Sequence, residues 1–376
     1  MTIPARATYS VPVIKKDQPD DTYKFQPLPK PSGTYPYRMD LETVLPGYQN
    51  KNKLVFHMAG DTGSLRSPDF QREIALAMAG QYKSGLADDR PLFLYHLGDV
   101  VYNYGEAGEY AGQFFRPYEC YPGPILAIAG NHDSDVNPLS PVPYQSLDAF
   151  TAVFCDTVQR LVVFSGNSKR KSMVQPNVYW TLEIPLATII GLHSNVPKYG
   201  IVTNEQRDWF IEELKAANLQ RPHKALIICL HHAPYSADTN HGSSLPMIGL
   251  LEGVFAETGI RPDLVVSGHV HNYQRFSKLY ADGLAVTYIV AGGGGYDELH
   301  PMALIDDDRF TADNPLFKDI RLESYCDDRH GFLKIAIEKG PNGLVLVGEY
   351  YAVNNNAKTE SDDTTVLADS FRFDLR

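Results

Sequence analysis

Polar side chains follow directly after five short apolar runs of this sequence. The runs with their polar ends read KLVFHMAGD, PLFLYHLGD, PILAIAGNHD, KALIICLHH and DLVVSGHVH. Carboxylate, amide and imidazole groups, together with a phenolate from Tyr102, form a ligand set that suits Zn, Fe or Mn. Seven such groups suffice for two metal ions that share one carboxylate, an arrangement that activates water and supports phosphoryl transfer. The number of ligands therefore predicts a binuclear metal site.

No single motif carries this prediction. GDTG at 60–63 is by itself typical of a turn. His269 and His271 in GHVH alternate along a strand-like segment and so face the same way, which suits two metal ligands. GNHD at 130–133 places Asn, His and Asp together at the end of an apolar strand. The combination of these motifs indicates chemistry where each alone does not.

The elements that position these groups are strands of an α/β protein. Continuous apolar runs of this length are typical of strands buried on both faces. Functional groups in such sheets gather beyond the carboxyl ends of the strands, so the five polar ends are expected at one place. Helical patterns lie between the strands at 69–85 and 203–218, the second opened by a capping box of Thr203 and Gln206. Strand patterns after residue 283 predict a second sheet.

The domain organisation follows from a change in composition near residue 50. Residues 1–50 are rich in proline and tyrosine without helical or strand period, and we expect an extended arm packed over a domain, with disorder as the alternative. Residues 51–376 are expected to form a single catalytic domain. A long connection with a short helix spans 134–176, and AGGGG at 291–295 lacks the Lys-Ser/Thr of a phosphate loop, so it is interpreted as a tight connection near the site.

Charge and cysteine content restrict the partners and the compartment. The formal net charge is −11, and KRK at 169–171 is the densest basic stretch, so neither a nucleic acid nor a membrane is expected as partner. No run approaches the ~18 apolar residues of a membrane span. The four cysteines form no CxxC motif, and the first residues show no apolar signal-peptide core. A cytoplasmic enzyme is expected, with a secreted form that has lost its leader as the alternative.

The motifs GDTG, GDVVY, GNHD, ICLHHAPY and GHVHNYQR, in this order, resemble the five motif blocks of the binuclear metallophosphoesterases, the calcineurin-like superfamily. The resemblance is closest to the purple acid phosphatases. Asp61 is followed by Thr62 and Gly63, whereas most of the superfamily has Asp-x-His there. Tyr102 matches the tyrosine of the GDxxY motif, whose phenolate binds a ferric ion in these enzymes and colours them. The resemblance implies a four-layer α/β/β/α sandwich with two mixed sheets flanked by helices.

The resemblance also implies a ligand set. Asp99 would bridge two metal ions, with Fe(III) at the Tyr102 site and Fe, Zn or Mn at the second. His231 fits the spacing of the fourth block better than His232, which would point to the opposite side of a regular strand and support the ligand or face the substrate. Ala233 stands where the family usually has proline. The first metal would be held by Asp61, Asp99, Tyr102 and His271, and the second by Asp99, Asn131, His231 and His269, with His241 and His232 as substrate-binding residues.

The expected reaction is hydrolysis of a small phosphate ester, most simply a phosphomonoester, by a metal-bound hydroxide. His132 resembles the general acid of the family, and an imidazole with an unperturbed pKa near ~6.5 can protonate a leaving alkoxide near neutral pH. Asp133 or a backbone carbonyl could hold the other nitrogen of His132. A phosphodiesterase with the same centre and a non-catalytic metal-binding scaffold are the alternatives. The physiological substrate and the oligomeric state stay undetermined by the sequence.

Overall fold

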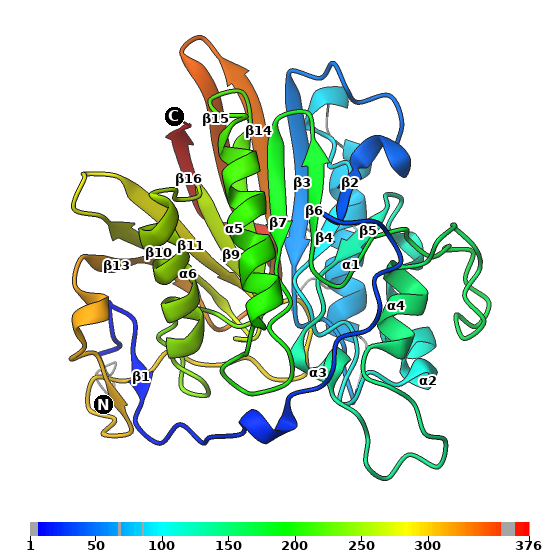
Figure 1. The fold of residues 1–376 in the computed structure, drawn as a ribbon, viewed down its shortest axis with the longest axis horizontal. Helices are drawn as coiled ribbons and strands as arrows, with labels where there is room; N and C mark the ends of the chain where they lie inside the picture. The colour runs from blue at the N-terminus through cyan, green and yellow to red at the C-terminus, as the bar shows by residue number, and fades with distance from the viewer. Residues whose placement is uncertain (1–6, 67–68, 85, 355–364, 376) are drawn as a thin grey trace.

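The computed structural model describes residues 7–66, 69–84, 86–354 and 365–375. Two large β-sheets form the centre of the molecule, and helices lie outside them (Figure 1). Both sheets are mixed, because each combines parallel and antiparallel neighbours. This arrangement confirms the layered α/β fold with two mixed sheets that the sequence predicts.

The first sheet has six strands in the order β16-β15-β14-β3-β4-β5. Strands β3, β4 and β5 are parallel and contain three of the apolar runs, whereas β14, β15 and β16 form an antiparallel meander. All three residues of β4 and of β5 are buried, as expected for strands covered on both faces. The bounds are β3 (Lys53–Ala59), β4 (Leu94–His96), β5 (Ile125–Ala127), β14 (Gly331–Gly340), β15 (Gly343–Val353) and β16 (Thr365–Asp374).

The second sheet has eight strands in the order β13-β10-β11-β9-β8-β7-β6-β2. Its central strands β7, β8 and β9 are parallel, and β8 and β9 contain the other two apolar runs. The bounds are β2 (Arg38–Asp40), β6 (Trp180–Ile184), β7 (Ala187–Gly191), β8 (Ala225–Leu230), β9 (Leu264–Ser267), β10 (Tyr273–Leu279), β11 (Ala285–Ala291) and β13 (Ile320–Cys326). A pair of short strands, β1 (Ile14–Lys15) and β12 (Phe310–Thr311), lies apart from both sheets.

Aromatic side chains join the two sheets. The ring of Tyr95 on β4 stacks on that of Trp180 on β6 with centroids 5.9 Å apart. The indole Nε1 of Trp180 donates to the carbonyl of Ala127 on β5 at 3.2 Å. These contacts hold the sheets together near their parallel strands and so fix the relative positions of the loops that follow them.

The helices begin and end where local sequence signals indicate. Thr203 caps α5 by accepting a hydrogen bond from the backbone N–H of Gln206 at 3.2 Å, as the capping box predicts. Helix α1 covers the pattern expected at 69–85, of which Gly85 lies outside the described residues. The α-helices are α1 (Asp69–Ser84), α2 (Ala107–Tyr110), α3 (Asn131–Ser134), α4 (Asp148–Phe154), α5 (Asn204–Asn218) and α6 (Leu245–Thr258), and shorter helical turns are η1 (Thr22–Lys24), η2 (Leu41–Thr43), η3 (Ala87–Asp89), η4 (Ala111–Phe115), η5 (Pro117–Cys120) and η6 (Pro315–Phe317).

The stretch before residue 50 runs across the molecule as an extended segment. It passes along the lower edge of the view in Figure 1, in blue, from β1 to η1 and onward. Backbone hydrogen bonds attach it to the rest of the chain, among them Val13 N–H to Ser236 O at 2.8 Å. Its strand β2 pairs in parallel with β6, which the sequence analysis does not predict, because three residues are too few to show an alternating pattern.

Two further properties of the described residues are relevant to the expectations above. The four cysteines carry free thiols, of which only Cys120 is exposed. Within the part of the chain that the structure describes, none of the helices is both long and apolar enough to span a bilayer.

Candidate metal centre and active site

The predicted site residues follow the carboxyl ends of five parallel strands drawn from both sheets. Asp61 follows β3, Asp99 follows β4, and Asn131 begins α3 just after β5. His231 directly follows β8, and His269 lies two residues beyond β9. Since parallel strands of both sheets end at the same side of the molecule, these side chains converge.

Three of these residues adopt left-handed backbone conformations. The φ angles are +58° for Asp61, +54° for Asp99 and +68° for His269. Such angles cost energy for residues other than glycine and persist where the surrounding structure enforces them, often at functional sites. His269 is therefore not in a strand as its alternation with His271 suggested. The sharp bend, rather than alternation, aims its ring at the site.

Glycine is needed beside Asp99 for steric reasons. A Cβ on Gly130 would lie 2.1 Å from Oδ1 of Asp99. A Cβ on Gly292, in the AGGGG segment, would lie 2.7 Å from Oδ2 of Asp61. The glycines of GNHD and of AGGGG thus let backbone pass directly against the two carboxylates, as expected for a tight connection near the site.

Asp61, Asp99 and His231 form a compact buried group whose ligand atoms all lie within 4.8 Å of one another. Nε2 of His231 lies 3.3 Å from Oδ2 of Asp99 and 4.0 Å from Oδ1 of Asp61. Burial raises the pKa of Asp61 to about 8. Burial alone would lower the pKa of His231, but the charges of Asp99 and Asp61 outweigh it and raise that pKa to about 9. Both raised pKa values mean that protons are held between these ligand atoms, at positions that a metal ion could take instead.

Asn131 connects two imidazoles of this cluster. Its Oδ1 lies 3.1 Å from Nε2 of His231 and 3.0 Å from Nδ1 of His269. An amide oxygen and two imidazole nitrogens at these distances can converge on one ion together with the nearby Asp99 carboxylate.

Tyr102 and His271 lie on the other side of the carboxylates. The Tyr102 hydroxyl is 3.2 Å from Nε2 of His271 and 3.4 Å from Oδ1 of Asp61. Both backbone groups of Tyr102 are held by the Gln113 amide, at 2.9 Å for the N–H and 2.8 Å for the carbonyl. Burial and the charges of Asp99 and Asp61 raise the pKa of the Tyr102 phenol above its usual range, so a phenolate here requires a cation.

Hydrogen bonds at the outer nitrogens test whether metal ions fit these histidines. Nδ1 of His231 lies 2.8 Å from the carbonyl of Leu97, and Nδ1 of His271 lies 3.1 Å from that of Glu298. A carbonyl can only accept, so both Nδ1 atoms carry protons, and the Nε2 atoms, which face the carboxylates, are the ones available to a metal ion. Two acceptors this close repel each other unless a proton or a cation lies between them. The donor set fits metal ions.

His132 lies at the start of α3 beside these carboxylates. Its backbone N–H donates to Oδ1 of Asp99 at 2.8 Å, and its Nδ1 donates to the carbonyl of Asn103 at 2.8 Å. The ring lies over Tyr102 with centroids 4.4 Å apart. Of the two partners considered for the outer nitrogen, the backbone carbonyl is the one observed. Nε2 is left as the ring nitrogen for substrate chemistry.

Asp133 does not hold the His132 ring, but joins two loops of the site. Its Oδ1 accepts from the backbone N–H groups of Val100 and Val101, at 2.9 and 3.2 Å, and its Oδ2 accepts from Gly130 N–H at 2.9 Å. This buried carboxylate therefore joins the loop after β4 to the loop after β5, and so fixes the positions of Asp99 and Asn131 relative to each other.

The structure corrects the expected orientation of His232. Strand β8 ends at Leu230, so side chains no longer alternate, and the His232 ring lies 4.3 Å from that of His269 instead of on the opposite side. Its Nδ1 lies 2.7 Å from Oγ of Ser194. The His241 ring also lies close to His269, at 4.1 Å. Both predicted substrate-binding histidines thus border the cluster.

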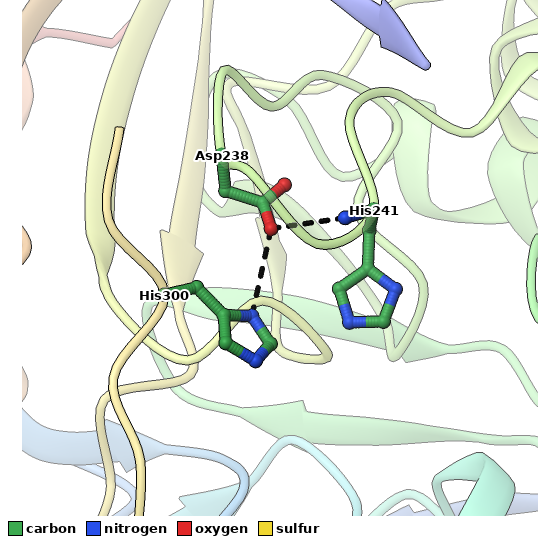
Figure 2. Close-up of side chains that lie close together, drawn as sticks. All are labelled: Asp238, His241 and His300. Atoms are coloured by element: carbon green, nitrogen blue, oxygen red, sulfur yellow. Dashed lines mark hydrogen bonds and ion pairs between the residues drawn. The ribbon is translucent and has the colours of Figure 1, made fainter. Parts of the chain in front are cut away.

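Sequence reasoning missed His300. Its ring stacks on His271 with centroids 4.1 Å apart, and its backbone N–H donates to the carbonyl of His271 at 2.9 Å. Figure 2 shows His300 facing Asp238, with its Nδ1 3.5 Å from Oδ2 of that carboxylate, and His241 beside them. His300 lies 29 positions after His271 in a loop without periodicity, so no local signal marks it.

The cluster opens into a cavity of about 530 Å³. His132, Asn131, Asp99, His269 and His271 line one part of it. His241, His300, Lys198 and the segment around η1 line the rest. A small ester can therefore reach the cluster.

The fold and this cluster define a protein of the metallophosphoesterase class. The family model described as calcineurin-like phosphoesterase matches residues 49–273. This range exceeds half of the chain, and the chain belongs to the calcineurin-like phosphoesterase family. The family predicted from the five motifs is thereby confirmed.

Individual relatives agree with this assignment at low identity. The chain is similar to probable purple acid phosphatase 20 of Arabidopsis thaliana, with 26% identity over 66% of the chain and 52% of the relative, and to purple acid phosphatase 21 of the same plant, with 27% identity over 45% and 36%. The chain thus spans about half the length of the first relative and a smaller part of the second. Among solved structures it resembles GAP50, the anchor in the inner membrane complex of Plasmodium, with TM-score 0.56, 14% identity and coverage of 87% and 90%, a likeness of fold.

Proposed function

We propose that the protein hydrolyses phosphate monoesters with a binuclear metal centre of the purple acid phosphatase kind. The observation that carries the proposal is the convergence of seven donor side chains from both sheets, two of them the buried carboxylates of Asp61 and Asp99. The similarity to plant purple acid phosphatases supports the finer assignment.

The donors divide into two sets that share Asp99. The first is Asp61, Asp99, Tyr102 and His271, which suits Fe(III) because phenolate and carboxylate are hard ligands. The second is Asp99, Asn131, His231 and His269, which suits Fe, Zn or Mn. Bound there, two metal ions would neutralise the phosphoryl oxygens and lower the pKa of water.

The chain's own residues orient the ester and supply a proton. His132 holds its Nδ1 on the carbonyl of Asn103, and its Nε2 can donate a proton to the oxygen that leaves phosphorus. His241 lines the cavity beside the His269 ring and can donate to phosphoryl oxygens. His232 is fully buried against the same ring and would support it. His231 and His271 are held through carbonyl-bound Nδ1 atoms, which fixes the ring orientation that metal binding requires.

Steady-state hydrolysis of phenyl phosphate and of diphenyl phosphate by the metal-loaded protein tests the proposal. We expect kcat/KM for the monoester to exceed that for the diester. A clear preference for the diester would instead assign a phosphodiesterase with the same centre. Absence of turnover with both metal sites filled would favour a metal-binding scaffold.

A further inference from the structure

The cavity beside the metal cluster has a second end that the hydrolysis of a simple ester does not use. This end is formed by Lys198, in the loop after β7, and by the N-terminal segment at η1. The lining side chains there are Asp20, Asp21, Tyr23, Lys24, Lys198 and His300.

Each acidic side chain of the lining already has a partner. Asp20 accepts from the hydroxyl and the backbone N–H of Thr22, at 2.7 and 3.1 Å. Asp21 forms an ion pair of 3.4 Å with Lys24. At the other wall, Glu298 pairs with Arg66 at 3.0 Å, and Asp135 accepts from the N–H of Val136 at 2.9 Å.

Lys198 differs, because its ammonium has no ion pair and no hydrogen bond to any residue that the structure describes. The side chain is half-buried. Burial lowers the pKa of Lys198, as expected for a cation that lacks a close counter-charge. In a chain with a net charge of −11, an unpaired lysine in a cavity is a binding group for an anion.

The nearby Asp238 carboxylate is not the missing partner. Its Oδ1 accepts from Ser236 Oγ and from Gly242 N–H, both at 2.8 Å, and its Oδ2 accepts from the N–H groups of Asn240 and His241 at 2.8 and 3.0 Å. These four donors already satisfy it. The group of Asp238, His241 and His300 in Figure 2 is thus a buried support for the wall of the cavity.

Lys198 is held in place by the N-terminal segment. Both carboxylate oxygens of Asp21 lie 3.2 Å from the backbone nitrogen of Lys198. The side chain of Asn195 exchanges two hydrogen bonds of 2.9 Å with the backbone of Gln26. The loop after β7 and the segment at η1 therefore form one wall, which holds the backbone of Lys198 in place beside the cavity.

His300 adds a neutral donor to the same cavity. Its Nδ1 accepts from the backbone N–H of His271 at 3.2 Å, so the proton of the neutral ring is on Nε2. His300 lines the same cavity as Lys198, and Nε2 forms no hydrogen bond within the described ranges.

We propose that Lys198 and His300 form a subsite for a second anionic group, so that the preferred substrates are phosphate esters whose leaving group carries a carboxylate or a further phosphate. This inference rests on the proposed function. The metal centre would take the scissile phosphate, and the subsite would take the other charge of the same molecule.

The test uses substrates that differ only in that charge. For the metal-loaded protein of residues 1–376, kcat/KM is measured with phenyl phosphate and with its 3-carboxyphenyl and 4-carboxyphenyl analogues. The wild type should prefer a carboxylated ester. Lys198→Gln should lower kcat/KM for the carboxylated ester about tenfold, because this ester loses a charge-assisted contact. The same variant should change kcat/KM for phenyl phosphate by less than about twofold, because phenyl phosphate has no second charge to lose. Lys198→Arg should keep most of the preference.

A matched lysine variant serves as the control for the change in net charge. Lys339 is exposed near the end of β14, and Lys339→Gln, with the same change in net charge, should alter kcat/KM for neither substrate. Equal losses on both esters would place Lys198 at the scissile phosphate, and no loss on either would remove it from recognition. Both results overturn the subsite.

The proposed function and the subsite can fail separately. Calorimetric titration with phenylphosphonate and 4-carboxyphenylphosphonate, which are not hydrolysed, measures binding without turnover. If the wild type turns over neither ester, the proposed function fails, and the subsite still stands if the carboxylated phosphonate binds more tightly and Lys198→Gln removes that difference. Equal binding of both phosphonates by the wild type overturns the subsite even if phenyl phosphate is hydrolysed.

Discussion

The hydroxyl of Tyr102 lies 3.2 Å from Nε2 of His271. The two residues come from loops that follow different sheets, β4 in the first and β9 in the second. Because Nδ1 of His271 is occupied by the carbonyl of Glu298, Nε2 accepts, and the phenol proton lies between the two groups. A metal ion bound as the proposed function requires would replace this proton and contact both side chains.

Tyr102→Phe tests this relationship. We expect two metals per chain in wild type and a broad visible band from tyrosinate bound to iron, and we expect the substitution to abolish the band. The ring packing against His132 and Tyr296, at 4.4 and 4.3 Å, does not need the hydroxyl, so the variant should fold. Metal analysis and the visible spectrum give the answer. Two metals without a band in wild type would reduce Tyr102 to a packing role.

His132→Ala should reduce kcat by about 10²- to 10⁴-fold while both metals are retained, since the loss removes proton donation and no proposed ligand. Steady-state kinetics with phenyl phosphate measure kcat, and metal analysis of the same sample measures the number of bound metals. His223→Ala, at an exposed position, is the control and should match wild type. An unchanged kcat in His132→Ala would exclude this residue as the general acid.

Asp133→Asn should lower the free energy of unfolding by about 1–3 kcal/mol, because one of its acceptor oxygens becomes a donor that faces backbone N–H groups. Urea unfolding of both proteins measures the difference. Glu323 on β13 is exposed, and Glu323→Gln should stay within about 0.5 kcal/mol of wild type. Equal stability of Asp133→Asn and wild type would refute the bridging role derived from its three hydrogen bonds.

The stability of the metal-free protein should fall as pH decreases from about 6.5 toward 4. Burial lowers the pKa of His57 to about 3, whereas the unfolded chain binds this proton near ~6.5. Between these values only the unfolded state takes up the proton, so His57 contributes up to about 1.4 kcal/mol of lost stability per pH unit. Urea unfolding at several pH values measures the slope.

His57→Gln isolates that contribution. Its neutral side chain cannot titrate, so the decline below pH 6.5 should become shallower by roughly the uptake of one proton. His223→Gln, at an exposed site, should leave the slope as in wild type. A slope unaffected by His57→Gln would mean that the imidazole is protonated in the folded protein.

Much of the fold could be predicted because its cause is local. The apolar runs of β3, β4, β5, β8 and β9 are continuous and end in polar residues, and burial on both faces requires that composition. The cap of α5 at Thr203 is equally local. Strand β2 was missed since its three residues pair with β6 from more than a hundred positions away.

For the site, the sequence by itself determined which chemical groups stand at the ends of the strands, since the order of the motifs is a property of the chain. Only the tertiary structure decided their directions. Left-handed angles at Asp61, Asp99 and His269 bend side chains away from where alternation would aim them. The approach of His300 to His271 and of Asp21 to Lys198 depends on loops folding back over long separations, and no periodicity in the residues between them encodes such contacts.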